Sequence, residues 1–344
     1  MRAVTYQAPG EVRIEEKDDP QVASPDEAVI RVESTGVCGS DLHLYHGRIT
    51  IEQGFTLGHE YVGTVVDAGD GVERVTPGDR VLGAFVTACG KCFFCRLGEF
   101  TKCDHGRVFG HGSTLGSLQG AQADLLLVPN ADMALRPVPD GLSDDVALFA
   151  GDVMGTGYHA VDALGTGDGD AVAVLGLGPV GLCAVQVARA AGASQVIAVD
   201  SVEDRLAMAE SFGATPVHLT EDDVRAKVKE VTEGRGVDGC VDAVGHPSAL
   251  DMACRLTRKA GTVSATGVYS ERLELHMGVV WIKSLTLRTG QANVIAHLDP
   301  VLDGLTSGRL DPSPLVTHHM SLEEAAEAYE VYDRREALKI VLRP

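Results

Sequence analysis

Between residues 171 and 267 the sequence alternates short apolar runs with helix-forming segments, a spacing that few architectures accommodate. Runs such as AVAVLG and QVIAVD are rich in valine and alanine. The expected strands cover residues 171–176, 195–200, 216–219, 239–245 and 261–267, and the expected helices cover residues 179–191, 203–212, 222–233 and 247–257. A helix over 154–164 precedes the series and a strand over 284–290 ends it. This alternation predicts a parallel, doubly wound α/β sheet.

A glycine-rich turn joins the first expected strand of this series to the helix that follows it. Gly176, Gly178 and Gly181 form the pattern G-x-G-x-x-G, and Asp200 ends the next strand. In this context the glycines allow a tight turn and let a pyrophosphate approach the helix N-terminus, where free N–H groups favour an anion. The expected cofactor-binding residues are Gly176, Gly178, Pro179, Val180, Gly181, Asp200 and Arg205.

The residue that ends the second strand indicates which dinucleotide binds. Asp200 is placed to accept hydrogen bonds from the adenosine ribose hydroxyls, and its charge would repel a 2′-phosphate. Arg205 follows five residues later and is expected to cover the adenine or its ribose. The sequence therefore predicts NAD rather than NADP. The alternative is a doubly wound fold whose glycines serve only helix–strand packing.

The segments on either side of this region differ from it. Up to about residue 150, short strands and frequent turn signals predict an irregular all-β domain. After about residue 288 one helix, opened by a capping box of Ser321 and Glu324, precedes a final strand. Because this tail is too short to fold alone, we expect it to complete the first domain. The predicted domains are residues 1–150 with 288–344, and residues 151–287.

Composition restricts the partners and the location of the chain. A net charge of −20 disfavours binding to nucleic acid or to anionic lipid. The sequence shows no membrane span and no signal peptide, so we expect a cytoplasmic protein. Eight cysteines in such a chain do not indicate a disulfide framework. Cys183, Cys240 and Cys254 lie among apolar residues and are expected to be small buried side chains.

Four cysteines are concentrated in the stretch ACGKCFFCRLGEFTKC. Cys89, Cys92, Cys95 and Cys103 have the spacing C-x2-C-x2-C-x7-C. Four thiolates on one short loop suit tetrahedral zinc, whereas the iron–sulfur alternative has a shorter last interval followed by proline. A site closed by four protein ligands leaves no position open for substrate. We therefore expect it to be structural.

A second group of potential ligands is dispersed along the chain. The stretch GVCGSDLHLYHG includes Cys38, GHEYVG includes His59 and Glu60, and GDVMGTGYHA includes Asp152. Ligands from distant segments are typical of a catalytic zinc, which keeps one coordination position open. Spacing alone is only suggestive, because a single histidine is more often a structural residue than a ligand.

Several motifs in one order identify a resemblance. The chain shows CGSDLH, GHEYVG, PGDRV, the four-cysteine stretch, DVMGTGYHA and GLGPVG. Over essentially its whole length it resembles the zinc-dependent medium-chain alcohol dehydrogenase family. It is most similar to the bacterial branch that contains secondary alcohol dehydrogenases and formaldehyde dehydrogenase-like enzymes. The resemblance implies a GroES-like β domain with an inserted Rossmann domain, and a cleft between them where substrate and nicotinamide meet.

The resemblance also implies the ligands of two zinc ions. Cys38, His59 and Asp152 would bind the catalytic zinc, and Glu60 would be an adjacent carboxylate able to enter the coordination sphere. The four-cysteine stretch would bind the structural zinc. Asp152 stands where many relatives have a cysteine, and its alternative role is to cap the helix that starts at Val153.

Further roles follow from the same resemblance. Ser40 would hydrogen-bond the alcohol oxygen and His43 would pass the proton to solvent; the alternatives are a turn-capping serine and a surface histidine. Asp41 could orient the His59 imidazole. Phe85 would line the substrate pocket or belong to the core. Lys339 would reach the pyrophosphate or be a solvated lysine.

The resulting prediction is a zinc-dependent oxidoreductase that transfers hydride between a primary or secondary alcohol and NAD, giving an aldehyde or ketone. Its alternatives are an aldehyde-oxidising or dismutating enzyme with tightly bound NAD, then a polyol dehydrogenase. A non-catalytic NAD(H)-binding protein on the same scaffold is a third. The expected partners are a small alcohol, aldehyde or ketone, and further copies of the chain as a tetramer or a dimer.

Overall fold

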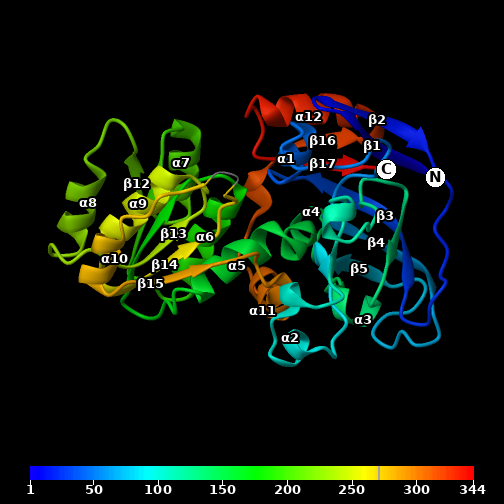
Figure 1. Cartoon of the computed structure of the whole chain (residues 1–344), viewed down its shortest axis with the longest axis horizontal. Helices are drawn as coiled ribbons and strands as arrows, with labels where there is room; N and C mark the ends of the chain where they lie inside the picture. The colour runs from blue at the N-terminus through cyan, green and yellow to red at the C-terminus, as the bar shows by residue number, and fades with distance from the viewer. Residues whose placement is uncertain (270–271) are drawn as a thin grey trace. The chain divides into compact units, whose positions relative to one another are not determined.

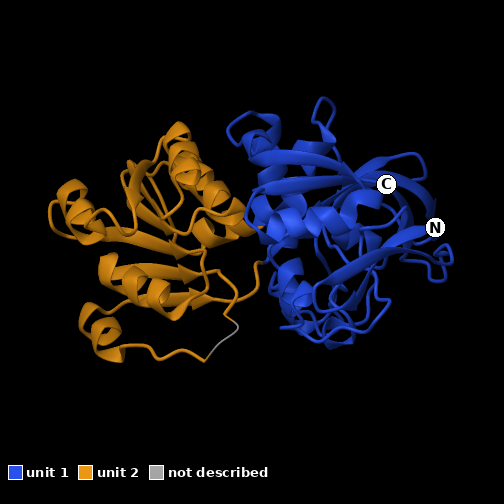
Figure 2. Cartoon of the chain, turned by 90° about the horizontal axis from the view of Figure 1, so that it is seen from above, with its two compact units in different colours: residues 1–155, 293–344 blue, residues 156–292 orange. Residues whose placement is uncertain are grey.

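The chain divides into two compact units, coloured blue and orange in Figure 2. Unit 1 comprises residues Met1–Gly155 and Asn293–Pro344, and unit 2 comprises residues Thr156–Ala292. The computed structural model describes residues 1–269 and 272–344. The units end at residues 155 and 292, where the sequence analysis placed the boundaries at 150 and 287.

Unit 2 is built on a six-stranded sheet with the strand order β12-β11-β10-β13-β14-β15 (Figure 1). Every neighbouring pair in it is parallel. The strands are β10 (Ala171–Leu175), β11 (Gln195–Asp200), β12 (Thr215–His218), β13 (Val237–Asp242), β14 (Thr257–Ala265) and β15 (Thr286–Thr289). The chain moves outward from β10 to β12 and then returns to place β13 on the other side of β10. This reversal confirms the predicted doubly wound, Rossmann-type sheet.

The first helix of this region precedes β10, and the others connect the parallel strands of the sheet. They are α5 (Val153–Asp162), α6 (Pro179–Ala190), α7 (Glu203–Ser211), α8 (Val224–Val231), α9 (Pro247–Leu256) and α10 (Met277–Lys283). The core contains the side chains of Val199, Val217 and Val263, which lie on three of the strands. Cys183, Cys240 and Cys254 are buried, as predicted. Helix α10 was not predicted from the sequence.

Unit 1 is built mainly of antiparallel strands. Its largest sheet has the order β16-β17-β3-β4-β5-β9, with β8 also paired to β3, and two smaller sheets pair β1 with β2 and β6 with β7. The strands are β1 (Arg2–Ala8), β2 (Glu11–Glu16), β3 (Ala28–Val37), β4 (Tyr61–Ala68), β5 (Arg80–Gly83), β6 (Val86–Thr87), β7 (Arg107–Val108), β8 (Leu125–Val128), β9 (Leu135–Pro137), β16 (Val316–Ser321) and β17 (Lys339–Arg343). This is the expected GroES-like domain.

Most helices of unit 1 are short. They are α1 (Asp41–Tyr45), α2 (Phe93–Arg96), η1 (Phe100–Lys102), η2 (Ser113–Leu115), α3 (Ala131–Ala134), α4 (Asp144–Ala147), η3 (Leu148–Gly151), α11 (Val294–Thr306), η4 (Ser313–Leu315), η5 (Leu322–Glu324) and α12 (Ala325–Asp333). The predicted capping box of Ser321 and Glu324 is present. Helix α11, which contains Pro300, was not predicted from the sequence. Among the described residues, no helix has both the length and the apolar character needed to cross a membrane.

The C-terminal strand completes the large sheet of unit 1. Strand β17 pairs in an antiparallel register with β3, so that Ile340 lies opposite Val37, and in a parallel register with β16. The first residue of β17, Lys339, is fully buried. Its ammonium group donates to Glu60 Oε2, and Glu60 is fully buried as well. The tail therefore joins unit 1 through backbone pairing and a buried ion pair.

This ion pair corrects one prediction about cofactor binding. Burial by itself would lower the pKa of Lys339, but the charge of Glu60 raises it above its ordinary value. The ammonium group is thus held charged inside unit 1, where it also lies 3.4 Å from the carbonyl oxygen of Val37. The expectation that Lys339 reaches the pyrophosphate of a cofactor is wrong, and so is its alternative of a solvated lysine.

We expect the substitution Lys339→Met to lower the free energy of unfolding by about 3–5 kcal/mol, because it leaves the Glu60 carboxylate buried without a counter-ion. The double variant Glu60→Gln/Lys339→Met removes both charges and should recover much of this loss. Urea unfolding of the two variants and of the wild type measures both effects. A single variant as stable as the wild type would show that the ion pair does not hold β17 in place.

Candidate functional site

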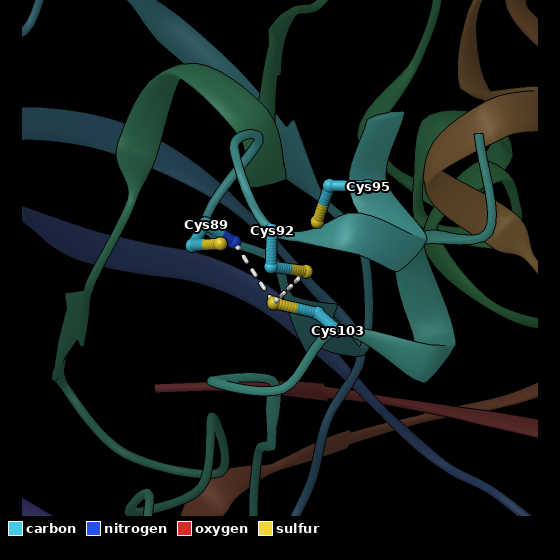
Figure 3. Close-up of side chains that lie close together, drawn as sticks. All are labelled: Cys89, Cys92, Cys95 and Cys103. Carbon is cyan, nitrogen blue, oxygen red and sulfur yellow. Dashed lines mark hydrogen bonds between the residues drawn. The ribbon is translucent and has the colours of Figure 1, made fainter. Parts of the chain in front are cut away.

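The four clustered cysteines of unit 1 converge on one point (Figure 3). Their sulfur atoms all lie within 4.8 Å of one another. Cys92 immediately precedes α2 and Cys103 immediately follows η1, so these two short helices close the loop around the cluster. The backbone N–H of Cys89 donates to Cys103 Sγ at 3.2 Å. The structure thus assembles the closed four-sulfur group that the spacing predicts.

The environment of the sulfurs suits a bound cation. Backbone N–H groups of Cys95 and Asp104 lower the pKa of Cys92 to about 6, which favours its thiolate. Burial and the neighbouring sulfurs instead raise the pKa of Cys95 to about 12. Four thiolates therefore coexist here only when a metal ion compensates their charge, since a coordinating thiol loses its proton outright. A tetrahedral zinc ion fits this donor set.

A second group joins residues from three distant segments of unit 1. Cys38 follows β3, His59 precedes β4, and Asp152 lies between η3 and α5. Asp152 Oδ2 is 3.2 Å from Cys38 Sγ and 3.1 Å from His59 Nε2. One potential ligand atom from each residue lies within 4.8 Å of the others. The three predicted ligands thus converge.

Close backbone contacts bring two of these ligands into place. Gly58, which precedes His59, has φ +88°, and a Cβ atom there would lie 2.4 Å from the side chain of Gln122. A Cβ atom at Gly151, which precedes Asp152, would lie 2.1 Å from the carbonyl oxygen of Gly83 at the end of β5. Only glycine allows such approaches. Glycine before His59 and before Asp152 is therefore a requirement of the site geometry.

Two neighbouring polar side chains lie against the imidazole of His59. Asp41 Oδ1 lies 3.2 Å from His59 Nδ1, and Asp41 Oδ2 accepts a hydrogen bond of 2.9 Å from the backbone N–H of Cys38. Ser40 Oγ lies 3.2 Å from His59 Nε2. Ser40 precedes α1, but its side chain makes no capping hydrogen bond. The predicted orienting role of Asp41 agrees with this geometry, and the capping alternative for Ser40 does not.

Two aromatic rings contact the His59 imidazole. The Phe85 ring is buried and meets the His59 ring edge to face, with centroids 6.4 Å apart. The His111 ring is closer, with centroids 5.2 Å apart, and its Nδ1–H donates to the carbonyl oxygen of Phe109 at 2.8 Å. Sequence analysis did not single out His111. Its only local signal is a histidine between two glycines shortly after the four-cysteine stretch.

Two further predicted site residues do not belong to the group of three converging ligands. His43 is on α1, where burial and the charges of Arg48 and His46 lower its pKa. Glu60 follows His59 in the chain, but its carboxylate binds Lys339 and does not belong to the converging group. The relay role of His43 and the coordination of a metal ion by Glu60 remain predictions.

The charge of the buried groups provides a test for a metal ion. The carboxylates of Asp41, Glu60 and Asp152 and the ammonium of Lys339 are all buried, which leaves two negative charges (three minus one) when His59 is neutral. Burial by itself would lower the pKa of His59, but Asp41 and Asp152 raise it well above its ordinary value. The cluster therefore favours a cation. A divalent ion balances the excess, and sulfur, nitrogen and oxygen donors are the ligands of zinc.

A third group that could hold a metal ion lies in unit 2 and is made of Glu203, His218 and Glu221. Both nitrogens of its imidazole are already engaged. The backbone N–H of Glu221 donates to His218 Nδ1 at 3.2 Å, and His218 Nε2 lies 3.2 Å from the carbonyl oxygen of Ser201. Through these contacts His218 joins the loop that contains Glu221 to the loop that contains Ser201, which accounts for the position of its ring.

The glycine loop of unit 2 is shaped by its own backbone. A Cβ atom at Gly181 would lie 1.8 Å from the carbonyl oxygen of Gly176, so α6 approaches the loop as closely as glycine permits. A Cβ atom at Gly178, which precedes Pro179 at the start of α6, would have no atom of another described residue within 4 Å beyond its chain neighbours. The loop is thus crowded on one side and open at Gly178.

Asp200 and Arg205 lie next to this loop. Asp200 Oδ2 accepts a hydrogen bond of 2.6 Å from the backbone N–H of Leu177, inside the loop. Asp200 Oδ1 accepts from the N–H groups of Ser201 and Val202. A nitrogen of Arg205 lies 4.0 Å from the Asp200 carboxylate. The predicted ribose-binding residue is therefore fixed beside the glycines.

Comparison with known proteins assigns both halves of the chain. Residues 24–140 match the family described as alcohol dehydrogenase GroES-like domain, and residues 179–297 match the family described as zinc-binding dehydrogenase. A zinc-type alcohol dehydrogenase-like protein of Bacillus subtilis is 36% identical and an alcohol dehydrogenase of Cupriavidus necator is 31% identical. The matches cover all of this chain in both cases, and 100% and 99% of those proteins.

A solved structure supports the same assignment. The alcohol dehydrogenase TADH from Thermus sp. ATN1 is 42% identical, with a TM-score of 0.97 over 100% of this chain and 99% of that one. The similarity thus extends over both units, the four-cysteine loop and the glycine loop. The chain belongs to the zinc-type alcohol dehydrogenase family of oxidoreductases.

Proposed function

We propose that the protein is a zinc-dependent oxidoreductase that transfers hydride between a small primary or secondary alcohol and NAD, giving an aldehyde or a ketone. The observation that carries this proposal is the convergence of Cys38, His59 and Asp152 in a buried, negatively charged environment. Three protein ligands leave one coordination position of a zinc ion open, which is the arrangement of catalytic zinc.

The proposed chemistry divides between the metal and the protein. A zinc ion at the three ligands would supply Lewis acidity that lowers the pKa of an alcohol hydroxyl. Ser40 Oγ, next to His59 Nε2, would accept a hydrogen bond from the alcohol hydroxyl. As it takes the hydroxyl proton, Ser40 would give its own proton to His43 on α1, which would pass it to solvent. Asp41, whose Oδ1 lies 3.2 Å from His59 Nδ1, would keep the His59 ring in one orientation. The four-cysteine group would bind a second zinc ion and hold its loop.

We propose that NAD is the hydride acceptor. Solved relatives carry either dinucleotide: NADP in a zinc-binding dehydrogenase of Sinorhizobium meliloti and NADH in an alcohol dehydrogenase of Escherichia coli. The choice for this chain rests on Asp200, whose carboxylate lies beside the glycine loop and would repel a 2′-phosphate. Further copies of the chain would assemble as a tetramer or a dimer.

A second candidate function is the oxidation or dismutation of aldehydes with tightly bound NAD. It is favoured by similarity to a glutathione-independent formaldehyde dehydrogenase of Bacillus subtilis, which is 30% identical over all of this chain. Cofactor retained through desalting would support this candidate.

The central experiment measures reduction of NAD⁺ and NADP⁺ with a panel of primary, secondary and polyol alcohols and with formaldehyde, on protein of known metal content. We expect two zinc ions per chain, turnover of one class of monohydric alcohol, and a preference for NAD⁺. Reduction of NADP⁺ in preference to NAD⁺ would contradict the role given to Asp200. Turnover of none of these substrates by zinc-loaded protein would contradict the proposed function.

Two substitutions separate the roles of the two metal sites. His59→Ala should lower kcat/KM by at least about a hundredfold and should leave the fold intact. Replacing a residue that only orients a metal ligand already lowers activity by about 10- to 100-fold, and His59 is itself a proposed ligand. Cys92→Ser should release one zinc ion and lower the unfolding temperature, because structural zinc contributes directly to folding. Circular dichroism, zinc analysis and initial rates measure these effects. A Cys92→Ser variant of unchanged stability but without activity would reverse the assignment.

Two glycines of the cofactor loop test how the dinucleotide binds. Gly181→Ala should destabilise unit 2 by about 1–3 kcal/mol, because its Cβ atom overlaps the Gly176 carbonyl oxygen. Gly178→Ala should leave stability unchanged, since its φ of −66° and open surroundings accept a methyl group. It should nevertheless raise the dissociation constant of NADH at least about tenfold by occupying the path of the pyrophosphate. Thermal unfolding and NADH fluorescence titration distinguish the two effects, and unchanged NADH binding by Gly178→Ala would exclude this path.

A further inference from the structure

The order in which the chain adds strands to the sheet of unit 2 changes direction between β10 and β13. This reversal point divides the carboxyl ends of the six parallel strands into two halves. The glycine loop and Asp200 belong to the half formed by β10, β11 and β12. A dinucleotide lies across the carboxyl edge of such a sheet at the reversal point. If Asp200 binds the adenosine ribose, the nicotinamide end therefore lies over the ends of β13 and β14.

A fully buried carboxylate organises the end of β13. Asp242 is the last residue of this strand. Its Oδ1 accepts hydrogen bonds from the backbone N–H groups of Val244, at 2.9 Å, and Gly245, at 3.2 Å. Its Oδ2 accepts a hydrogen bond from the hydroxyl group of Tyr269, which follows β14. The side chain of Asp242 thus ties the loop after β13 to the segment after β14.

The backbones of the two segments also pack directly against each other. The N–H groups of Thr266 and Gly267 donate to the carbonyl oxygen of Asp242, each at 2.9 Å. A Cβ atom at Gly267 would lie 2.1 Å from the nitrogen of Gly245, and one at Gly245 would lie 2.5 Å from the carbonyl oxygen of Val268. These contacts leave little freedom for either segment once the Asp242 hydrogen bonds are made.

Two apolar side chains are exposed on these segments. Val244 is 50% exposed and Val268 is 55% exposed. Val244 also borders the glycine loop, because a Cβ atom at Gly176 would lie 2.6 Å from Val244 Cγ2. Single exposed valines are ordinary, but these two lie on interlocked loops next to the cofactor loop. Together they form an apolar wall, which we call the Val244–Val268 wall.

We propose that Tyr269 is a positioning residue for the nicotinamide ring: its hydroxyl group, acting through Asp242, fixes the Val244–Val268 wall against which the ring packs. The proposal rests on the proposed function, since it requires a nicotinamide dinucleotide. The planar nicotinamide ring is the part of the cofactor that an apolar wall recognises. Tyr269 itself touches Asp242 and needs no contact with the ring.

The test compares two ligands that differ only at the nicotinamide. NADH contains the ring and ADP-ribose lacks it, so the ratio of their dissociation constants measures recognition of the ring alone. Tyr269→Phe removes the hydroxyl group and retains the aromatic ring. We expect it to raise the dissociation constant of NADH by about three- to tenfold, the size of effect expected from losing one ordinary hydrogen bond, and to leave that of ADP-ribose unchanged.

Two valine substitutions complete the experiment. Val268→Ala shortens an exposed side chain of the wall. It should raise the ratio of the NADH dissociation constant to the ADP-ribose dissociation constant without lowering stability. Val202→Ala shortens a valine that is 36% exposed and follows Asp200 in the other half of the sheet, so it should leave the ratio unchanged. Isothermal titration calorimetry of the wild type and the three variants with both ligands gives all the ratios.

The outcomes separate this proposal from the proposed function. If the wild type binds neither ligand, the proposed function and this inference both fail. If the wild type binds both, and Tyr269→Phe changes neither constant or weakens both equally, only the positioning role of Tyr269 fails. A ratio that rises in Tyr269→Phe but not in Val268→Ala would overturn the wall as the surface on which the ring packs.

Discussion

The stability of unit 1 depends on how its buried carboxylates are compensated by positive groups and hydrogen bonds. Asp41, Glu60 and Asp152 are buried within a short distance of His59 or Lys339. Each buried carboxylate is costly unless a positive group or several hydrogen bonds face it. Lys339 compensates one of them and the backbone N–H of Cys38 helps a second. What remains is a local excess of negative charge, which favours a bound cation.

The same charges couple the positions of separate strands of unit 1. Glu60 precedes β4, Lys339 opens β17, and both strands flank β3 in the sheet. A change in the position of either strand would separate the ion pair. The carboxylate that lies beside His59 in the chain is thereby paired with Lys339, so one set of interactions links the sheet to the neighbourhood of the three converging residues.

The sequence predicted those parts of the molecule whose signals are local. The βα alternation of unit 2 and the four-cysteine loop each depend on residues close together in the chain, and both were recognised. The convergence of Cys38, His59 and Asp152 required resemblance, because no spacing rule relates residues on three separate segments. The role of Lys339 was mistaken because its partner lies 279 residues away. Helix α10 was missed because its large apolar residues face solvent, as Trp281 shows with 77% exposure.

The discontinuity of unit 1 has a consequence for biosynthesis. Lys339 contacts the carbonyl oxygen of Val37, 302 residues earlier, and β17 is a direct neighbour of β3. At about 5–20 residues per second, a ribosome needs about 15–60 s to synthesise the intervening chain. Unit 2 is continuous and is complete before β17 emerges. During this interval β3 lacks one neighbour and Glu60 lacks its counter-ion, so a nascent chain is most exposed to aggregation and to chaperones at the edge that the last five-residue strand later covers.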